Sequence, residues 1–241
     1  MGGIVYILAQ KAHSEATAPF PLPSCSISTL ALSIPVPIAK MLANTTMLRI
    51  GVLLVAPIQL LDVAPIDLFA MTTVEYFKSC NRPQELIDIA IPNENLSITY
   101  IAASGANTSS PTSASLDLGV DAGLNDPAVA PGQLDMLIIP GPPPALVPAE
   151  EELQFVRDHV NAGVELLTVC SGMYVAAHAG VLDGKKATGT APAAELAKKF
   201  PGVKWEDKRY VNDGKIWTSG KFIEPGVNFW TATKVGGSPY H

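Results

Sequence analysis

Apolar runs alternate with amphipathic segments along most of this chain of 241 residues. From residue 47 onwards, short runs of apolar residues have the length of buried strands, and the segments between them carry apolar residues at helical spacing. The predicted strands are 48–55, 97–104, 134–140, 164–169 and 185–189, followed by a hairpin of 203–211 and 215–219. The predicted helices are 63–77, 149–163, 171–180 and 192–200.

The order of these segments predicts an α/β fold. Continuous apolar strands that alternate with helices are typical of a mainly parallel sheet covered on both faces. In the helix over 149–163, Leu153, Val156 and Val160 fall on one stripe, and Gly163 suits the position just after the helix. The polar stretch 104–115 is expected to be a loop.

The two ends of the chain differ from this pattern. Residues 1–46 carry five prolines and no sustained period, so we expect a poorly ordered extension, and Met47 is a candidate for the natural start. Residues 221–241 show no helical period, and we expect an atypical tail. Because Gly220 and the two residues after it can be encoded with a splice-donor consensus, a translated intron is one hypothesis for this tail. The expected domain is therefore 47–220.

Composition narrows the classes of partner. The chain is 48% hydrophobic and 16% charged, with a net charge of −6, which gives no reason to expect nucleic acid. No uninterrupted apolar run approaches the roughly 18–20 residues of a membrane helix. Cys25, Cys80 and Cys170 are too few for a disulfide framework, and none has a metal-type partner nearby. We expect a cytoplasmic protein without metal or cofactor.

Cys170 is the first candidate for chemistry. It ends the apolar run 164–169, and Ser171 and Gly172 lead directly into a helix. A sharp strand-to-helix turn of this kind can present a nucleophile, and the helix N-terminus would lower the pKa of its thiol. The alternative is a small packing residue at a strand end. Spacing alone leaves both open, because Thr168 stands where the hydrolase pattern has glycine.

Four stretches carry a resemblance to a known family. The run TVCSGMYVAAHAGVLDGKKATG resembles the "SVCTG…LAxAGLLDGRRAT" segment of the ThiJ/PfpI (DJ-one) family, in the class I glutamine-amidotransferase-like superfamily. RIGVLLVAPIQLLDVAPIDLF, LDMLIIPGP and KRYVNDGKIWTSG match further family segments in the same order. The resemblance covers roughly residues 47–220. The QLLD and VCSG forms are most similar to the isonitrile-hydratase-like and fungal subgroup.

The resemblance implies a fold and a pair of reactive groups. The family fold is a flavodoxin-like three-layer αβα sandwich, with Cys170 as nucleophile on its elbow. Asp62 matches an acidic residue that hydrogen-bonds the sulfur, and it would act as general acid and base. Since two anions in contact repel, such a pair shares a proton. An N-cap for helix 63–77 is the other interpretation of Asp62, and Asp67 is expected at the surface.

The same resemblance assigns the neighbours of the nucleophile. Ser171 would supply a hydroxyl and a backbone oxyanion donor, although it is also a plausible turn residue. Gly141 matches a loop that gives a second N–H to the oxyanion. The chain departs from the family pattern at Pro142, which is followed by Pro143 and Pro144. Since proline has no N–H, any oxyanion site must rely on Gly141 and Ser171.

Histidine is absent where protease-like and glyoxalase-like members carry it, in the stretch 187–196. His178 lies about two turns beyond Cys170 and should point away from it. His159 is expected to be solvated, and His13 and His241 lie in the terminal segments. A Cys-His hydrolase is therefore disfavoured. The loop residue Cys80 has no acid-base neighbours in sequence and is assigned no function.

The predicted function is that of a cysteine-dependent enzyme acting on a small electrophilic molecule. Hydration of an isonitrile to a formamide, a lyase reaction, is the most concrete form. The alternatives are a glyoxalase- or deglycase-like enzyme, a redox-sensing stress protein with an oxidisable thiolate, and a truncated inactive product. Family members usually form homodimers, so a homodimer is expected.

Overall fold

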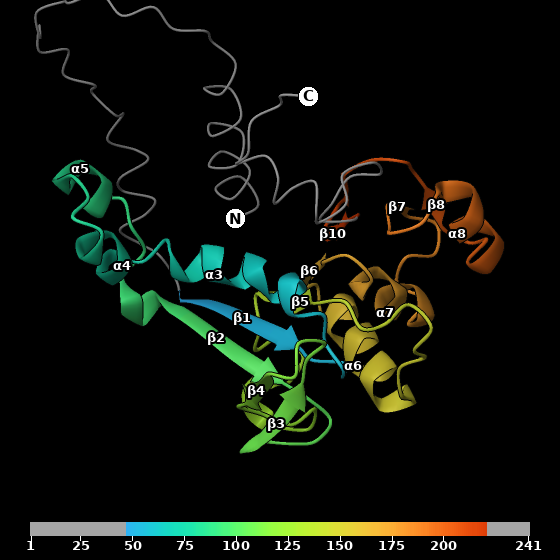
Figure 1. Ribbon diagram of the computed structural model, residues 1–241, viewed down its shortest axis with the longest axis horizontal. Coiled ribbons are helices and arrows are strands. Elements are labelled where there is room, and N and C mark those ends of the chain that lie inside the picture. The colour runs from blue at the N-terminus through green and yellow to red at the C-terminus, as the bar shows by residue number, and fades with distance from the viewer. Residues whose placement is uncertain (1–46, 221–241) are drawn as a thin grey trace, which may run out of the picture. The chain divides into compact units, whose positions relative to one another are not determined.

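Six strands form the central sheet of residues 47–220, the part of the chain that the computed structural model describes (Figure 1). Neighbouring strands are parallel except for the last pair, which forms an antiparallel hairpin. In spatial order the strands are β2 (Leu96–Ile101), β1 (Leu48–Leu53), β5 (Met136–Ile139), β6 (Glu165–Thr168), β10 (Ile216–Ser219) and β9 (Tyr210–Asp213).

The strands are apolar on both faces, as expected for a parallel sheet with helices on either side. Successive side chains of β5 point to opposite faces: Leu137 and Ile139 join one buried cluster, and Ile138 joins another. The strand β1 behaves in the same way, with Leu53 in the first cluster and Val52 in the second. The central strands thus contribute to a buried cluster on each face of the sheet.

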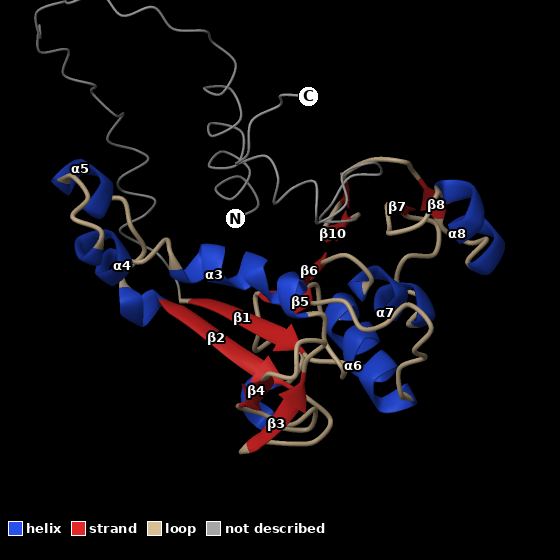
Figure 2. Ribbon diagram, viewed as in Figure 1, coloured by secondary structure: helices blue, strands red, loops and turns tan. Residues whose placement is uncertain are grey.

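Helices cover the two faces of the sheet (Figure 2). The helices α6 (Glu150–Asn161) and α7 (Gly172–His178) contribute to the cluster on one face. The short 3-10 helix η1 (Leu60–Val63) and the helix α3 (Ala64–Ala70) pack on the other. The remaining helical segments are α4 (Val74–Ser79), α5 (Gln84–Ile87), η2 (Asn93–Asn95), η3 (Pro127–Val129) and α8 (Ala193–Lys199). The predicted α/β sandwich is confirmed.

Several predicted boundaries shift. The single helix predicted over 63–77 is broken into α3 and α4, because the Thr73 hydroxyl accepts the Tyr76 N–H at 3.4 Å and starts a new helix. The predicted strand 203–211 divides into β8 (Lys204–Trp205), which pairs with β7 (Lys186–Ala187), and β9. Gly163 follows α6 with a φ of +80°, which confirms its predicted place after the helix.

The polar stretch expected to be a loop contains a strand. In it, β3 (Thr108–Pro111) pairs antiparallel with β4 (Asp117–Val120). Only Ser110 of β3 is buried, so this strand lacks the apolar alternation by which a sequence reveals a strand. The hairpin is also joined to the segment after β1, since Ile58 N–H donates to the Pro111 carbonyl at 3.0 Å.

The carboxyl ends of β1, β5 and β6 lie side by side and bring three connecting segments together. The segment after β5, residues 140–144, is called here the proline strap. Val169 N–H donates to the Ile139 carbonyl at 3.0 Å, and Gln59 N–H donates to the Gly141 carbonyl at 2.9 Å. These backbone bonds hold the three connections at one edge of the sheet.

The predicted extension 1–46 and tail 221–241 fall outside the described residues, so both stay predictions. Within residues 47–220, no helix has the length and apolar character needed to cross a membrane.

Candidate active site

Cys170 occupies a sharp turn between β6 and α7. Its φ is +54°, a left-handed backbone conformation that residues other than glycine rarely adopt and that often marks a functional site. Gly172, which opens α7, has no room for a side chain, since an added Cβ would collide with the Ile139 carbonyl oxygen. The predicted nucleophile elbow is therefore present as a backbone shape, and Cys170 is half-buried at its tip.

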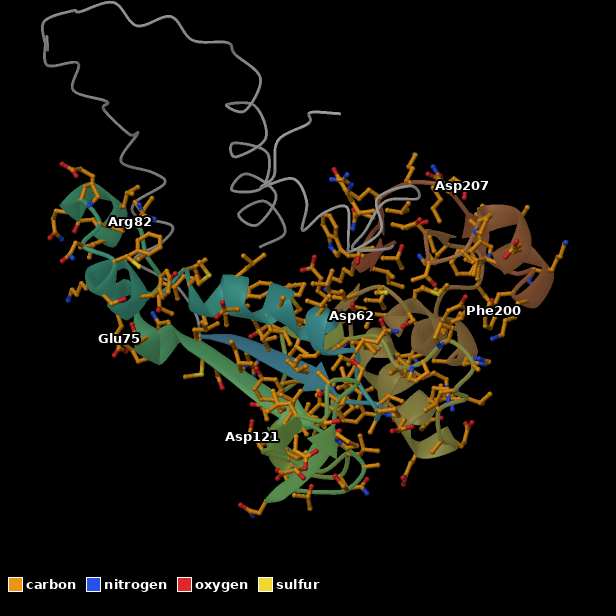
Figure 3. The ribbon with its side chains drawn as sticks, in the orientation of Figure 1. Asp62, Glu75, Arg82, Asp121, Phe200 and Asp207 are labelled. Atoms are coloured by element: carbon orange, nitrogen blue, oxygen red, sulfur yellow. The ribbon has the colours of Figure 1, made fainter. Side chains whose placement is uncertain are left out.

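Asp62 lies beside Cys170 although 108 positions separate them in the sequence (Figure 3 labels Asp62). It belongs to η1, is only 2% exposed, and its Oδ2 accepts the Gly141 N–H at 3.1 Å. The Cys170 thiol lies close enough to this carboxylate to stabilise its charged form. The helix-cap interpretation of Asp62 is wrong, because Val63 is the N-cap of α3 and has no capping side chain.

Burial raises the pKa of Asp62 to about 6, although the Gly141 N–H and the Cys170 thiol both stabilise the carboxylate. The pKa of the Cys170 thiol is also raised, to about 11, first by burial and then by the negative charge of Asp62. The Ser171 N–H and hydroxyl oppose that rise. At pH 7 the pair therefore holds one proton on sulfur and one negative charge on Asp62.

The direction of the thiol pKa differs from the sequence-based expectation. A helix N-terminus was expected to lower it, but α7 has only seven residues and its macrodipole acts on a sulfur that touches a carboxylate. The loss of solvent and the charge of Asp62 outweigh the opposing effect of the Ser171 N–H and hydroxyl. At neutral pH the Cys170 thiol is thus protonated, and the carboxylate beside it is that of Asp62.

The proline strap encloses the other side of the pair. Ser171 is fully buried, and its hydroxyl donates to the Pro142 carbonyl at 2.5 Å. The Gly141 N–H, predicted to serve an oxyanion, donates to Asp62 instead. Pro142 has no N–H to offer, as expected, but its carbonyl oxygen anchors Ser171. Gly141 and Ser171 are thus brought to the site, and the Gly141 N–H stabilises Asp62.

Gln59 is a member of the site that sequence reasoning missed. Its side-chain Nε2 donates to the Ser171 hydroxyl oxygen at 3.2 Å, and its backbone N–H holds the Gly141 carbonyl. Its only signal in the sequence is its place three residues before Asp62, in the QLLD stretch. A polar residue in that position carries no distinctive spacing, so the contact could be found only in three dimensions.

Both histidines of residues 47–220 are engaged away from Cys170. The prediction that His159 is solvated is wrong: the side chain is fully buried, with its ring nitrogens 2.7 Å from the Phe155 carbonyl and 2.9 Å from the Val129 carbonyl. His178 packs edge-on against Phe200 with ring centroids 5.1 Å apart (Figure 3 labels Phe200). Burial lowers the pKa of His178. The described site is therefore built on a thiol and a carboxyl.

The other candidates lie at the surface. Cys80 is exposed after α4, and Asp67 is exposed on α3 as expected. No cluster of three metal-ligating side chains occurs among residues 47–220.

Residues 70–226 match the model of the DJ-1/PfpI family. This chain belongs to that family. The matched span includes Gly141, Cys170 and Ser171, and it begins after Asp62. Family membership and the mostly parallel sheet agree with the resemblance drawn from the sequence.

One curated relative is the isonitrile hydratase of Pseudomonas putida, which is 32% identical over 98 residues. The matched stretch is 40% of this chain and 42% of the relative, so the chain spans less than half of that protein.

Two solved structures illustrate the similarity of fold. A DJ-1 superfamily protein from Agrobacterium tumefaciens has a TM-score of 0.53 at 20% identity, covering 72% of this chain and 82% of its own. An AraC family transcriptional regulator from Pseudomonas putida has a TM-score of 0.53 at 14% identity, covering 71% of this chain and 83% of its own. At these identities the similarity establishes the fold.

Replacing Gly141 by alanine should disturb the strap. An added Cβ would collide with the Ser171 hydroxyl and the Asp62 carboxylate, so we expect the free energy of unfolding to fall by about 1–3 kcal/mol. Gly119→Ala is the matched control, because a Cβ at Gly119 in β4 meets no atom within 4 Å. It should change the free energy by less than about 0.5 kcal/mol. Equal effects in urea denaturation would contradict the close approach at Gly141.

Asp62→Asn should change how stability depends on pH. The folded protein holds the Asp62 proton up to a pH of about 6, whereas the unfolded chain releases it near the ordinary value of 3.8. Between these values the unfolded state binds fewer protons, so this group makes the free energy of unfolding fall as pH rises.

Between these two pH values, we expect the free energy of unfolding of the wild type to fall by about 1–3 kcal/mol relative to that of Asp62→Asn. Denaturation at a series of pH values measures it, and a flat difference curve would show that burial leaves the Asp62 carboxyl unperturbed.

Proposed function

We propose that this protein is a cysteine-dependent enzyme that hydrates isonitriles to N-substituted formamides. The observation that carries the proposal is the buried contact between the Cys170 thiol and the Asp62 carboxylate at a nucleophile elbow. The local similarity to the isonitrile hydratase of Pseudomonas putida supports the choice of substrate class. The elbow position also agrees with family membership.

The first step would join sulfur to the terminal carbon of the isonitrile. As the S–C bond forms, Asp62 takes the thiol proton and becomes a neutral acid. Negative charge develops on the isonitrile carbon, and Asp62 returns the proton to that carbon. The product is a thioimidate bound to Cys170, with one S–H bond replaced by one C–H bond.

The second step would add water to the thioimidate carbon. Asp62, again a carboxylate, takes a proton from the attacking water, and the proton passes to the substrate nitrogen. The remaining hydroxyl proton returns to sulfur as the C–S bond breaks, which releases the formamide and restores the Cys170 thiol. The sum of the two steps is one isonitrile plus one water giving one formamide.

This reaction suits a site in which the Gly141 N–H is bound to Asp62. In the first step the charge develops on carbon, so no oxyanion has to be held by a free N–H. The Ser171 N–H and hydroxyl, which stabilise negative charge on sulfur, would assist when Cys170 gives up its proton. Asp62 needs the Gly141 hydrogen bond to remain ionised near neutral pH.

The redox-sensor alternative fits these groups less well. Oxidation to sulfinate proceeds through a thiolate, and burial together with Asp62 raises the pKa of Cys170. Glyoxalase- and deglycase-like chemistry is weakened by the engagement of both described histidines elsewhere. The homodimer and the cytoplasmic location stay predictions.

Incubation with a small alkyl isonitrile should remove its infrared band and produce the formamide, detected by NMR. Cys170→Ala should abolish turnover, while Cys80→Ala, at an exposed cysteine away from the site, should leave it unchanged. The rate should fall as pH drops below about 6, because protonated Asp62 cannot accept the thiol proton. Turnover that persists in Cys170→Ala, or its absence in the folded wild type, would contradict the proposal.

A further inference from the structure

The Ser171 hydroxyl group has more partners than one proton can serve. Its oxygen is fully buried and lies 3.2 Å from Gln59 Nε2 and 2.5 Å from the Pro142 carbonyl oxygen. The same hydroxyl belongs to the residue next to Cys170 and acts to lower the pKa of its thiol, against the effect of burial. A serine hydroxyl has one proton to donate and two lone pairs to accept with.

The roles of the three partners follow from their chemistry. Gln59 Nε2 is a donor and occupies a lone pair of the Ser171 oxygen. The Pro142 carbonyl can only accept. Cys170 accepts well only as a thiolate, since a neutral sulfur is a weak acceptor. The hydroxyl proton therefore has two destinations, and the charge on sulfur decides between them.

We propose that Gln59 is a positioning residue that sets the acidity of Cys170 through the Ser171 hydroxyl. Its amide holds the Ser171 oxygen, so that the hydroxyl proton points to the Pro142 carbonyl while sulfur is neutral and turns to sulfur when the thiolate forms. This inference deepens the proposed function, because that reaction requires Cys170 to give up its proton.

The backbone keeps Gln59 in place for this task. Its own N–H donates to the Gly141 carbonyl at 2.9 Å, and the Gly141 N–H donates to Asp62 at 3.1 Å. Together with the Ser171–Pro142 bond, these contacts close a ring between the segment after β1, the proline strap and the elbow. A donor to the hydroxyl oxygen also polarises the O–H group and strengthens the bond that it gives.

Only one proton moves when the Cys170 thiolate forms. The Cys170 proton moves to the Asp62 carboxylate, and no other bond to hydrogen breaks. The Ser171 hydroxyl exchanges its hydrogen bond to the Pro142 carbonyl for one to the thiolate, while the Gln59 amide stays on the oxygen throughout. The negative charge thus moves from Asp62 to the Cys170 sulfur. The Ser171 hydroxyl, which donates to that sulfur, is already held by the Gln59 amide.

Gln59→Met tests the inference, because methionine has a similar length and no donor. We expect the apparent pKa of Cys170 to rise by about 0.5–1 unit, since the thiolate loses part of its support. The measurement is the pH dependence of iodoacetamide labelling, read at the Cys170 peptide by mass spectrometry so that other cysteines do not interfere. An unchanged or lowered midpoint would overturn the proposal.

A double-mutant cycle distinguishes this route from a general loosening of the strap. In a Ser171→Ala background, Gln59→Met should leave the midpoint where Ser171→Ala alone puts it. A shift as large as in the wild-type background would show that Gln59 acts by another path. If Gln59→Met does not fold, Gln59→Asn serves instead, because its shorter amide cannot reach Ser171, and the same rise is expected.

These midpoints are measured without any isonitrile. A shift that depends on Ser171, found in a protein that does not hydrate isonitriles, would support the positioning role and reject the proposed reaction. Hydration of isonitriles without such a shift would support the proposed reaction and reject the positioning role of Gln59.

Discussion

The buried contact between the Asp62 carboxyl and the Cys170 thiol governs the chemistry of this site, because two groups in contact away from water cannot both carry a negative charge. Burial raises the pKa of each group, and the charge of Asp62 raises the pKa of the Cys170 thiol further. The pair therefore keeps one proton over the neutral range. In the proposed reaction, that proton moves from sulfur to the Asp62 carboxylate.

The fold supplies this contact by ending three parallel strands at one edge. The segment after β1 brings Asp62, the strap after β5 brings Gly141, and the elbow after β6 brings Cys170. The close approach is possible only because positions 141 and 172 have no side chain. Backbone geometry, rather than a cluster of charged side chains, thus places the acid beside the thiol.

The sequence predicted the strands and the elbow because these depend on local apolar runs and on short motifs, and the family resemblance suggested that Asp62 lies beside Cys170. It did not predict the direction of the thiol pKa, which depends on burial and on a carboxylate far away in the chain. The wrong prediction for His159 has a similar cause, since its burial depends on the η3 segment that supplies the Val129 carbonyl. Gln59 was missed because its partner, Ser171, is 112 residues away.

The most direct test of this account is the pH midpoint of iodoacetamide labelling at Cys170 in the wild type and in Asp62→Asn. If the Asp62 charge holds the proton on sulfur, asparagine should lower the apparent pKa of Cys170 by about one unit. If Asp62 instead stabilises a thiolate as a neutral acid, the same substitution should raise the pKa. A rise, or no change in a folded variant, would contradict the account.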